Sequence, residues 1–93
     1  MYLESLTPSP TKKLKAVFRL DSGRTRTIHF GAKGYDDFTI HKDKNRKDNY
    51  LRRHAAREDF NNPLTAGALS RWILWNKPTL EASVYDFRRR FNV

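Results

Sequence analysis

Three histidines are the side chains of this chain that could bind a transition metal. His29, His41 and His54 are separated by twelve and thirteen residues. Zinc sites usually pair their ligands at closer spacing and often include cysteine, and this chain has no cysteine. We therefore expect no metal and no other cofactor, and we interpret His54 as a hydrogen-bonded histidine in the core or at its rim.

A set of acidic residues could hold magnesium for phosphodiester cleavage. The set contains two adjacent acidic pairs, one further aspartate and one histidine: Asp36, Asp37, His41, Asp43, Glu58 and Asp59. Adjacent acids in loops are more often turn and capping residues, and Asp43 is well placed to cap a helix. Glu58 and Asp59 can pair with nearby arginines. We therefore expect no catalytic residues, and we expect that the protein is not an enzyme.

Basic side chains are the dominant chemical feature of the chain. Nineteen Lys and Arg residues stand against ten Asp and Glu residues, which gives a net charge of +9 over 93 residues. Such a charge favours an acidic partner: nucleic acid, an anionic protein surface or anionic lipid. Arginine binds phosphates and carboxylates alike, so the composition does not choose between these partners. The candidate partner-binding residues are Arg46, Lys47, Arg52, Arg53, Arg57, Arg88, Arg89 and Arg90.

Two strands are expected to precede the helices. In residues 13–20, Leu14, Ala16, Phe18 and Leu20 lie on one face, and Lys13, Lys15 and Arg19 are among the residues on the other, which is typical of a half-buried strand. Residues 25–30 form a second such segment, and Gly23 in the intervening turn can adopt a positive φ. The two segments predict a β-hairpin. Residues 35–40 are consistent with either a third short strand or an extended loop.

A first helix is expected to begin after Asp43 or Asn45 and to run to about Glu58. Its apolar stripe consists of four residues at helical spacing, with the basic residues largely outside it: Tyr50, Leu51, His54 and Ala55.

A second helix is expected to begin at Asn62–Pro63 or at Thr65 and to reach Trp75. Trp72 and Trp75 could stack on nucleic-acid bases. Their apolar neighbours favour the core instead, with one tryptophan left at the surface as an interface residue.

A third helix is expected after Pro78, which stops the second helix, with Thr79 as its cap. Its apolar residues recur at helical spacing: Leu80, Val84, Phe87 and Phe91. The fold class that these patterns predict is α+β: an N-terminal β-hairpin or small antiparallel sheet followed by three short helices. The predicted core contains Phe18, Leu20, Ile28, Phe30, Leu51, Leu69, Trp72, Ile73, Leu80, Val84 and Phe87.

Residues 1–11 are expected to form an N-terminal arm outside a single domain of residues 12–93. Pro8 and Pro10 disfavour a regular helix or a central strand in this segment. Its apolar residues are then free to dock on a partner: Tyr2, Leu3 and Leu6. No stretch of the chain reaches eighteen apolar residues, so we expect no membrane span.

Three sequence segments resemble those of a known group of proteins: FGAKGYDDFTIHKD at 30–43, YLRRHAARED at 50–59 and NPLTAGALSRWILWNKPTLEASVYDFRRRF at 62–91. They are similar to a family of small, basic, uncharacterised proteins encoded by large DNA viruses of algae and protists. The resemblance covers roughly residues 12–92 and implies a viral setting. It implies no catalytic residues.

The sequence and this resemblance together predict a non-enzymatic virion structural protein. The expected role is a minor capsid component that bridges acidic surfaces of other virion proteins, in the virion and inside the host cell during assembly. The alternative is a protein that binds DNA or RNA of the viral genome or replication site without sequence preference. A small factor that acts on host proteins is a third hypothesis.

Overall fold

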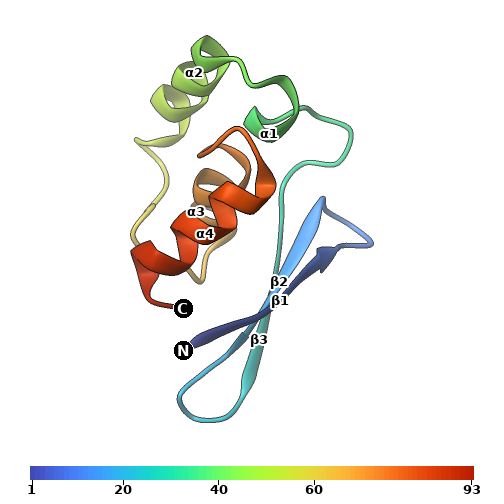
Figure 1. Cartoon of the computed structure of the whole chain (residues 1–93), viewed down its shortest axis with the longest axis vertical. Coiled ribbons are helices and arrows are strands. Elements are labelled where there is room, and N and C mark those ends of the chain that lie inside the picture. The colour runs from blue at the N-terminus through green and yellow to red at the C-terminus, as the bar shows by residue number, and fades with distance from the viewer.

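The computed structural model describes all 93 residues and confirms the α+β fold class. A three-stranded sheet comes first and the helices follow (Figure 1). The elements, in chain order, are β1 (Tyr2–Pro8), β2 (Leu14–Arg19), β3 (Thr25–Phe30), α1 (Phe38–His41), α2 (Lys44–His54), α3 (Ala66–Leu69), the π-helical turn η1 (Ser70–Leu74) and α4 (Leu80–Phe91).

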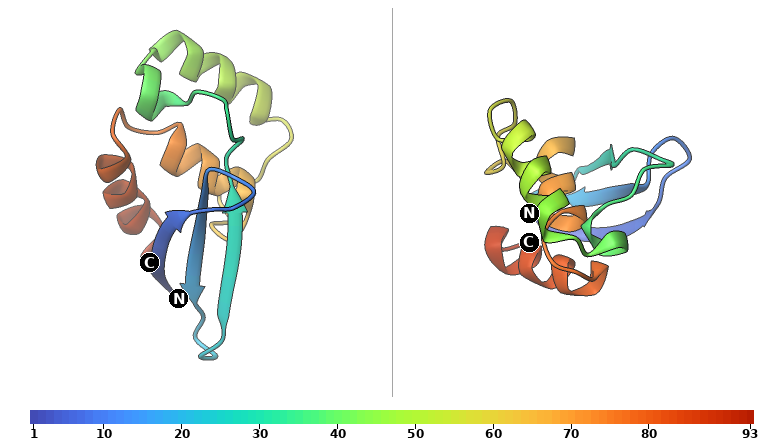
Figure 2. Two further views of the ribbon diagram at one scale, coloured as in Figure 1. Left: turned by 90° about the vertical axis from the view of Figure 1, so that its right-hand side faces the viewer. Right: turned by 90° about the horizontal axis from the view of Figure 1, so that it is seen from above.

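The sheet is antiparallel with the order β1-β2-β3, and it contains the predicted hairpin of β2 and β3. Gly23 turns this hairpin with a φ of 88°. The side chains of Leu14, Ala16 and Phe18 project from one face of β2, and Ala16 and Phe18 are fully buried there. The opposite face of the sheet bears no helix (Figure 2).

The predicted N-terminal arm is corrected by the structure, because residues 2–8 form the edge strand β1. The register shifts at Glu4, so that Leu3 lies opposite Phe18 and Leu6 lies opposite Ala16. This bulge turns two leucines three residues apart toward the same face, which a regular strand could not do. Pro8 is tolerated because β1 is at the edge and ends there.

Residues 35–37 form a loop, one of the two structures considered from the sequence, whereas residues 38–40 belong to a helix that neither alternative included. The short helix α1 begins at Phe38 because the Asp37 carboxylate accepts a hydrogen bond from the backbone N–H of Thr39, at 2.9 Å. Phe38 turns inward and is buried, whereas Tyr35 remains exposed in the preceding loop.

The three predicted helices are present, and the structure decides between the alternative starts. Asp43 caps α2 by accepting from the N–H groups of Asn45 and Arg46. Thr65 caps α3, which continues directly into η1, and Thr79 caps α4. Helix α2 ends at His54 rather than near Glu58, and residues 55–57 form a turn in which the Arg57 N–H donates to the His54 carbonyl three residues back.

One hydrophobic core lies between the sheet and the helices α3, η1 and α4, which cover one face of it (Figure 2). We call these elements the body, and we call residues 38–54, which carry α1 and α2, the α2 lobe. The lobe lies beyond the end of the sheet (Figure 1). The core cluster belongs entirely to the body: Leu3, Ala16, Phe18, Phe30, Leu69, Ile73, Leu74 and Phe87.

Several predicted core residues are less buried than expected. Leu80 is exposed because it begins α4, and a helical side chain leans toward the helix N-terminus, where only exposed residues precede it. Four others are only partly buried where they pack against the core: Leu20, Ile28, Trp72 and Val84. Leu51 is partly buried on α2, outside the core.

The two tryptophans pack against different parts of the molecule. Trp72 packs edge-on against Phe91 of α4, and its indole N–H donates to the Phe60 carbonyl at 2.7 Å. Trp75 instead faces the α2 lobe, where its ring stacks on Tyr50. The π-helical turn between them closes with the bond from the Trp75 N–H to the Ser70 carbonyl, five residues back. This wider turn helps to direct the two rings to different neighbours.

Candidate functional site

The exposed face of α2 carries the densest positive charge of the molecule. Residues 42–57 contain seven basic and two acidic residues, a net charge of +5 out of the total of +9. Arg46, Asn49 and Arg53 follow one another at three- and four-residue spacing, so they lie along one stripe of the helix. Arg52 and Arg53 are exposed and lie within 4.0 Å of no carboxylate. We call Arg46, Asn49, Arg52 and Arg53 the basic face.

A column of aromatic rings holds the basic face in place. Tyr50 stacks on Trp75 with the ring centroids 4.2 Å apart and the planes 2° from parallel. His54 stacks on the other side of Tyr50, also at 4.2 Å. His41 packs on Trp75 at 5.4 Å. The column connects both helices of the lobe to the C-terminal end of η1, so Trp75 is the aromatic link between lobe and body.

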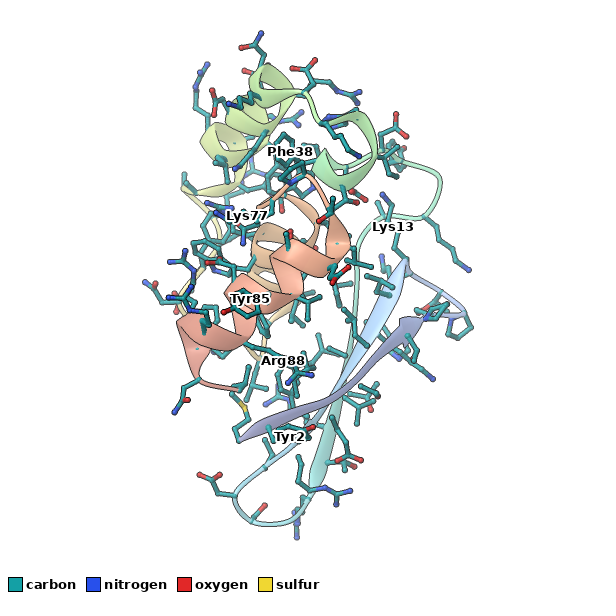
Figure 3. The ribbon with its side chains drawn as sticks, viewed as in Figure 1. Tyr2, Lys13, Phe38, Lys77, Tyr85 and Arg88 are labelled. Atoms are coloured by element: carbon teal, nitrogen blue, oxygen red, sulfur yellow. The ribbon has the colours of Figure 1, made fainter.

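Two lysines add polar connections between the lobe and the body. The Lys47 ammonium donates to the Asn76 carbonyl at 2.7 Å and lies 4.9 Å from the centre of the Phe38 ring. The Lys13 ammonium, at the end of the sheet, pairs with the buried Asp37 carboxylate at 2.6 Å. Figure 3 shows Phe38 and Lys77 in the region between the lobe and the body, with Lys13 near the end of the sheet. Both contacts orient the lobe without using its exposed arginines.

Positive charges crowd together where α2 meets η1 and α4. Burial lowers the pKa of Lys47, and the nearby cations Arg71 and Lys77 lower it further. Burial also lowers the pKa of Arg71, with a smaller contribution from Arg90. Asn76 donates to Asp86 at 2.7 Å and holds the pKa of that carboxyl below its usual value, with Arg90 acting in the same direction. An anion near this junction would meet several cations and one carboxylate.

The basic face borders a cleft of about 400 Å³ between the end of β3, α2 and η1. Arg46 and Arg53 line this cleft on the α2 side, and Trp75 lines it on the η1 side. The same three residues, together with Asn49 and Arg52, line a second, shallower hollow along the helix. The lobe therefore presents two concave surfaces with arginines at their rims.

The other predicted basic residues do not join this face. Arg88 donates to the carbonyls of Val93 and Leu3 and lies against the Tyr2 ring, so it ties α4 to β1 (Figure 3). Arg89 lies over the Tyr85 ring. Arg90 lies over the Trp72 ring at 3.8 Å and pairs with Asp86 at 3.4 Å. Arg57 is exposed just beyond the end of α2.

The residues of the predicted arm are divided between the core and the surface. Leu3 is fully buried, so the prediction that it contacts a partner is wrong: the bulge in β1 turns it into the core. Leu6 is partly buried against the core. Tyr2 is exposed at the sheet edge, where Arg88 lies against its ring.

The histidines and carboxylates do not converge. The structure contains no group of three or more His, Cys, Asp or Glu side chains that could hold a metal ion. His29 is hydrogen-bonded to Ser9 at 2.7 Å, and His41 accepts from the backbone N–H of Asp43. Of the acids, Asp37 and Asp43 cap helices. None of the helices combines the length and apolar character that crossing a membrane requires.

Sequence reasoning did not place three residues at the site, although it considered Trp75 as a residue that could stack on bases. Asn49 could have been found, because it lies three residues from Arg46 and four from Arg53 on one helical stripe. Trp75 and Tyr35 could not, because their places beside α2 depend on η1 and on the loop before α1. No local pattern reveals that three separate segments meet at one cleft.

Comparison with known proteins gives a family and no function. No curated protein and no solved structure matches the chain significantly. Residues 5–54 match a protein family of unknown function, DUF5754. The matched segment contains most of the sheet and the whole α2 lobe with its basic face, and it ends at the last residue of α2. Because the match covers more than half of the chain, the protein belongs to the DUF5754 family.

Proposed function

We propose that this protein is not an enzyme and binds nucleic acid without sequence preference through the basic face of α2. The observation that supports this most strongly is the net charge of +5 over residues 42–57, which contain α2, together with its exposed Arg52 and Arg53, which have no acidic partner. Such side chains are free to exchange bound counterions for phosphates. Release of those counterions drives non-specific binding to nucleic acid.

The composition of the face favours contacts with the phosphate backbone over contacts with base edges. Arginine and asparagine both contact base edges in sequence-specific proteins. Here Asn49 is the only amide beside three arginines, and arginines contact phosphates along a strand of any sequence. We expect dissociation constants on the order of 10⁻⁴ to 10⁻⁶ M at physiological salt, with affinity falling steeply as salt rises.

A second candidate function is a structural component of a virus particle, as the resemblance to viral proteins implies. One face of the sheet bears no helix and the outer edge of β1 is unpaired, so the body has surfaces that another virion protein could cover (Figure 2). The arm no longer supports this candidate, because it forms β1. On this hypothesis the acidic partner of the basic face is a capsid protein, and the protein resides in the virion.

A pair of charge-reversed variants tests the nucleic-acid proposal. The first carries Arg52→Glu and Arg53→Glu on the basic face. The control carries Arg24→Glu and Arg26→Glu on the β-hairpin, where both arginines are also exposed and unpaired. The two variants have the same net charge. Fluorescence anisotropy with a labelled oligonucleotide, measured across a salt series, gives the affinity and its salt dependence for each.

We expect the α2 variant to lose at least roughly ten-fold in affinity and its salt slope to fall by about two, since two phosphate contacts are removed. The hairpin variant should keep the slope of the wild type. Equal losses in both variants would mean that net charge alone causes binding, and the proposal would then be wrong. Fractionation of purified particles tests the second candidate: a structural protein stays with genome-free shells, whereas a genome-associated protein leaves with the nucleic acid.

A further inference from the structure

The cleft beside the basic face has the size of a small-ligand site. Its volume of about 400 Å³ lies within the range of about 300–1,000 Å³ that is usual for ligand pockets. Three separate segments form its walls: the end of β3 with the loop after it, the inner side of α2, and α3 with η1. The cleft is therefore a product of the tertiary fold and opens next to Arg46 and Arg53.

One aromatic ring in the cleft has no stacking partner. Tyr50 is covered on both faces by Trp75 and His54, and Trp75 has His41 as a further neighbour. The Tyr35 ring stacks on no other ring and has no cation over it, and 72% of the surface of this residue is exposed. It follows Gly34, whose φ of 83° places it in the left-handed region that favours glycine. The loop thus presents Tyr35 at the surface and leaves the ring free.

Charge around the cleft favours an anion. Lys12, Arg46 and Arg53 are exposed residues among its lining. The acidic lining residues are Asp36 and Asp37. Asp37 is neutralised by Lys13 at 2.6 Å, and Asp36 lies 3.9 Å from Arg46. The cleft therefore combines a free aromatic ring with excess positive charge, as in sites where proteins bind unpaired nucleotides.

We propose that this cleft receives one unpaired base of a single-stranded nucleic acid, which stacks on Tyr35 while Arg46 and Arg53 contact the adjoining phosphates. The inference rests on the proposed function and specifies its ligand as single strands. A base within a duplex is stacked on both sides and paired, so it must be unpaired and unstacked before it can enter. Duplexes bind only through phosphate contacts to the basic face.

Three probes of equal length separate base stacking from phosphate attraction: a single strand of thymidines, the same strand with every base removed, and a duplex. Fluorescence anisotropy is measured with the wild type and with Tyr35→Ala. Tyr85→Ala is the matched control, because Tyr85 is 66% exposed and lies on α4, outside the cleft lining (Figure 3). Neither substitution changes the net charge.

We expect Tyr35→Ala to weaken binding of the thymidine strand by roughly 5- to 150-fold, the effect of losing one base–aromatic stack. Binding of the abasic strand and of the duplex should stay unchanged, and Tyr85→Ala should change nothing. Equal binding of the thymidine and abasic strands by the wild type would overturn the inference, as would an equal loss of all three probes in Tyr35→Ala. In either case the proposed function would still be supported if the Arg52→Glu and Arg53→Glu variant bound the probes more weakly than the wild type. Absence of binding to every probe overturns both.

Discussion

The body and the α2 lobe are held together by different interactions. The body encloses eight buried residues in one cluster, and six of them are fully inaccessible: Leu3, Ala16, Phe18, Leu69, Ile73 and Phe87. The lobe contributes none of these. Of its inward side chains, Tyr50 stacks on Trp75 at the end of η1, and Phe38 lies beside the Lys47 ammonium of α2. The lobe in turn carries a net charge of +4 out of the protein's +9, although it contains fewer than one fifth of the residues.

This difference shows how a small basic protein can keep its charge without losing its fold. A charged helix packed across the centre of the core would place its arginines near the sheet, where desolvation is costly. Here α2 touches the body mainly through flat rings and through Lys47, so the arginines remain in solvent. We therefore expect substitutions in the body to act on the whole molecule and substitutions in the lobe to act locally.

The largest effect should come from the body. Phe18 is fully buried and packs at 6.4 Å from Phe87 across the interface between the sheet and α4. We expect Phe18→Ala to reduce the free energy of unfolding by about 3–5 kcal/mol, because the cavity collapses only in part. Chemical denaturation followed by circular dichroism measures this. If α2 kept its helical signal after the sheet had unfolded, the lobe would be independent of the body.

A smaller and more local effect is expected at the aromatic column. Tyr50→Ala removes the ring between Trp75 and His54. We expect a loss of about 2–4 kcal/mol, somewhat less than for Phe18 because the edge of the ring is not fully enclosed. Amide hydrogen exchange should rise in α2 well before it rises in β2. A uniform rise across both regions would contradict the division into body and lobe.

Alkaline pH should loosen the same contact. Burial raises the pKa of Tyr50 to about 12 from its usual value near 10. The folded state disfavours tyrosinate at this position, so this contribution to stability is complete below pH 10 and is lost as pH rises toward 12. Its size is on the order of 2 kcal/mol. Denaturation across this pH range should show a steeper loss for the wild type than for Tyr50→Phe, and parallel profiles would contradict the assignment.

The smallest effect concerns the connection between lobe and body. A Cβ added at Gly67 in α3 would collide with the carboxylate of Glu58, which lies just after α2. Gly→Ala in a helix normally stabilises by about 1 kcal/mol. We expect that gain only when Glu58→Ala is also present, and a reduced or reversed effect in the wild-type background. A double-mutant cycle in denaturant measures the coupling, and additive effects would mean that Glu58 moves aside freely.

The sequence predicts the helices well because their capping residues are local. Asp43, Thr65 and Thr79 each accept hydrogen bonds from N–H groups two or three residues ahead, a pattern that is visible in the sequence. Strand β1 is missed because a bulge at Glu4 breaks the alternation of Leu3 and Leu6. Pro8 also favours an arm over a strand in the sequence, although an edge strand can end with proline.

The basic residues of the site are predictable, but their division is not. Arg46, Arg52 and Arg53 are placed outside the apolar stripe by helical periodicity alone. The run Arg88–Arg90 looks like a single basic patch in the sequence. Its three guanidinium groups have different neighbours, because successive helical residues point about 100° apart. Only the tertiary fold shows that Arg88 belongs to the contact between α4 and β1.

The π-helical turn at Ser70–Leu74 makes the lobe sensitive to chain length at one place. This turn closes from Trp75 to Ser70 and so contains one more residue than an α-helical turn. Deletion of a single residue there would restore ordinary α-helical geometry, and the helix itself would survive. Trp75 would then rotate by about 100° about the helix axis, away from Tyr50. The number of residues in this one turn therefore determines where residues 42–57, with their seven Lys and Arg side chains, are held against the body.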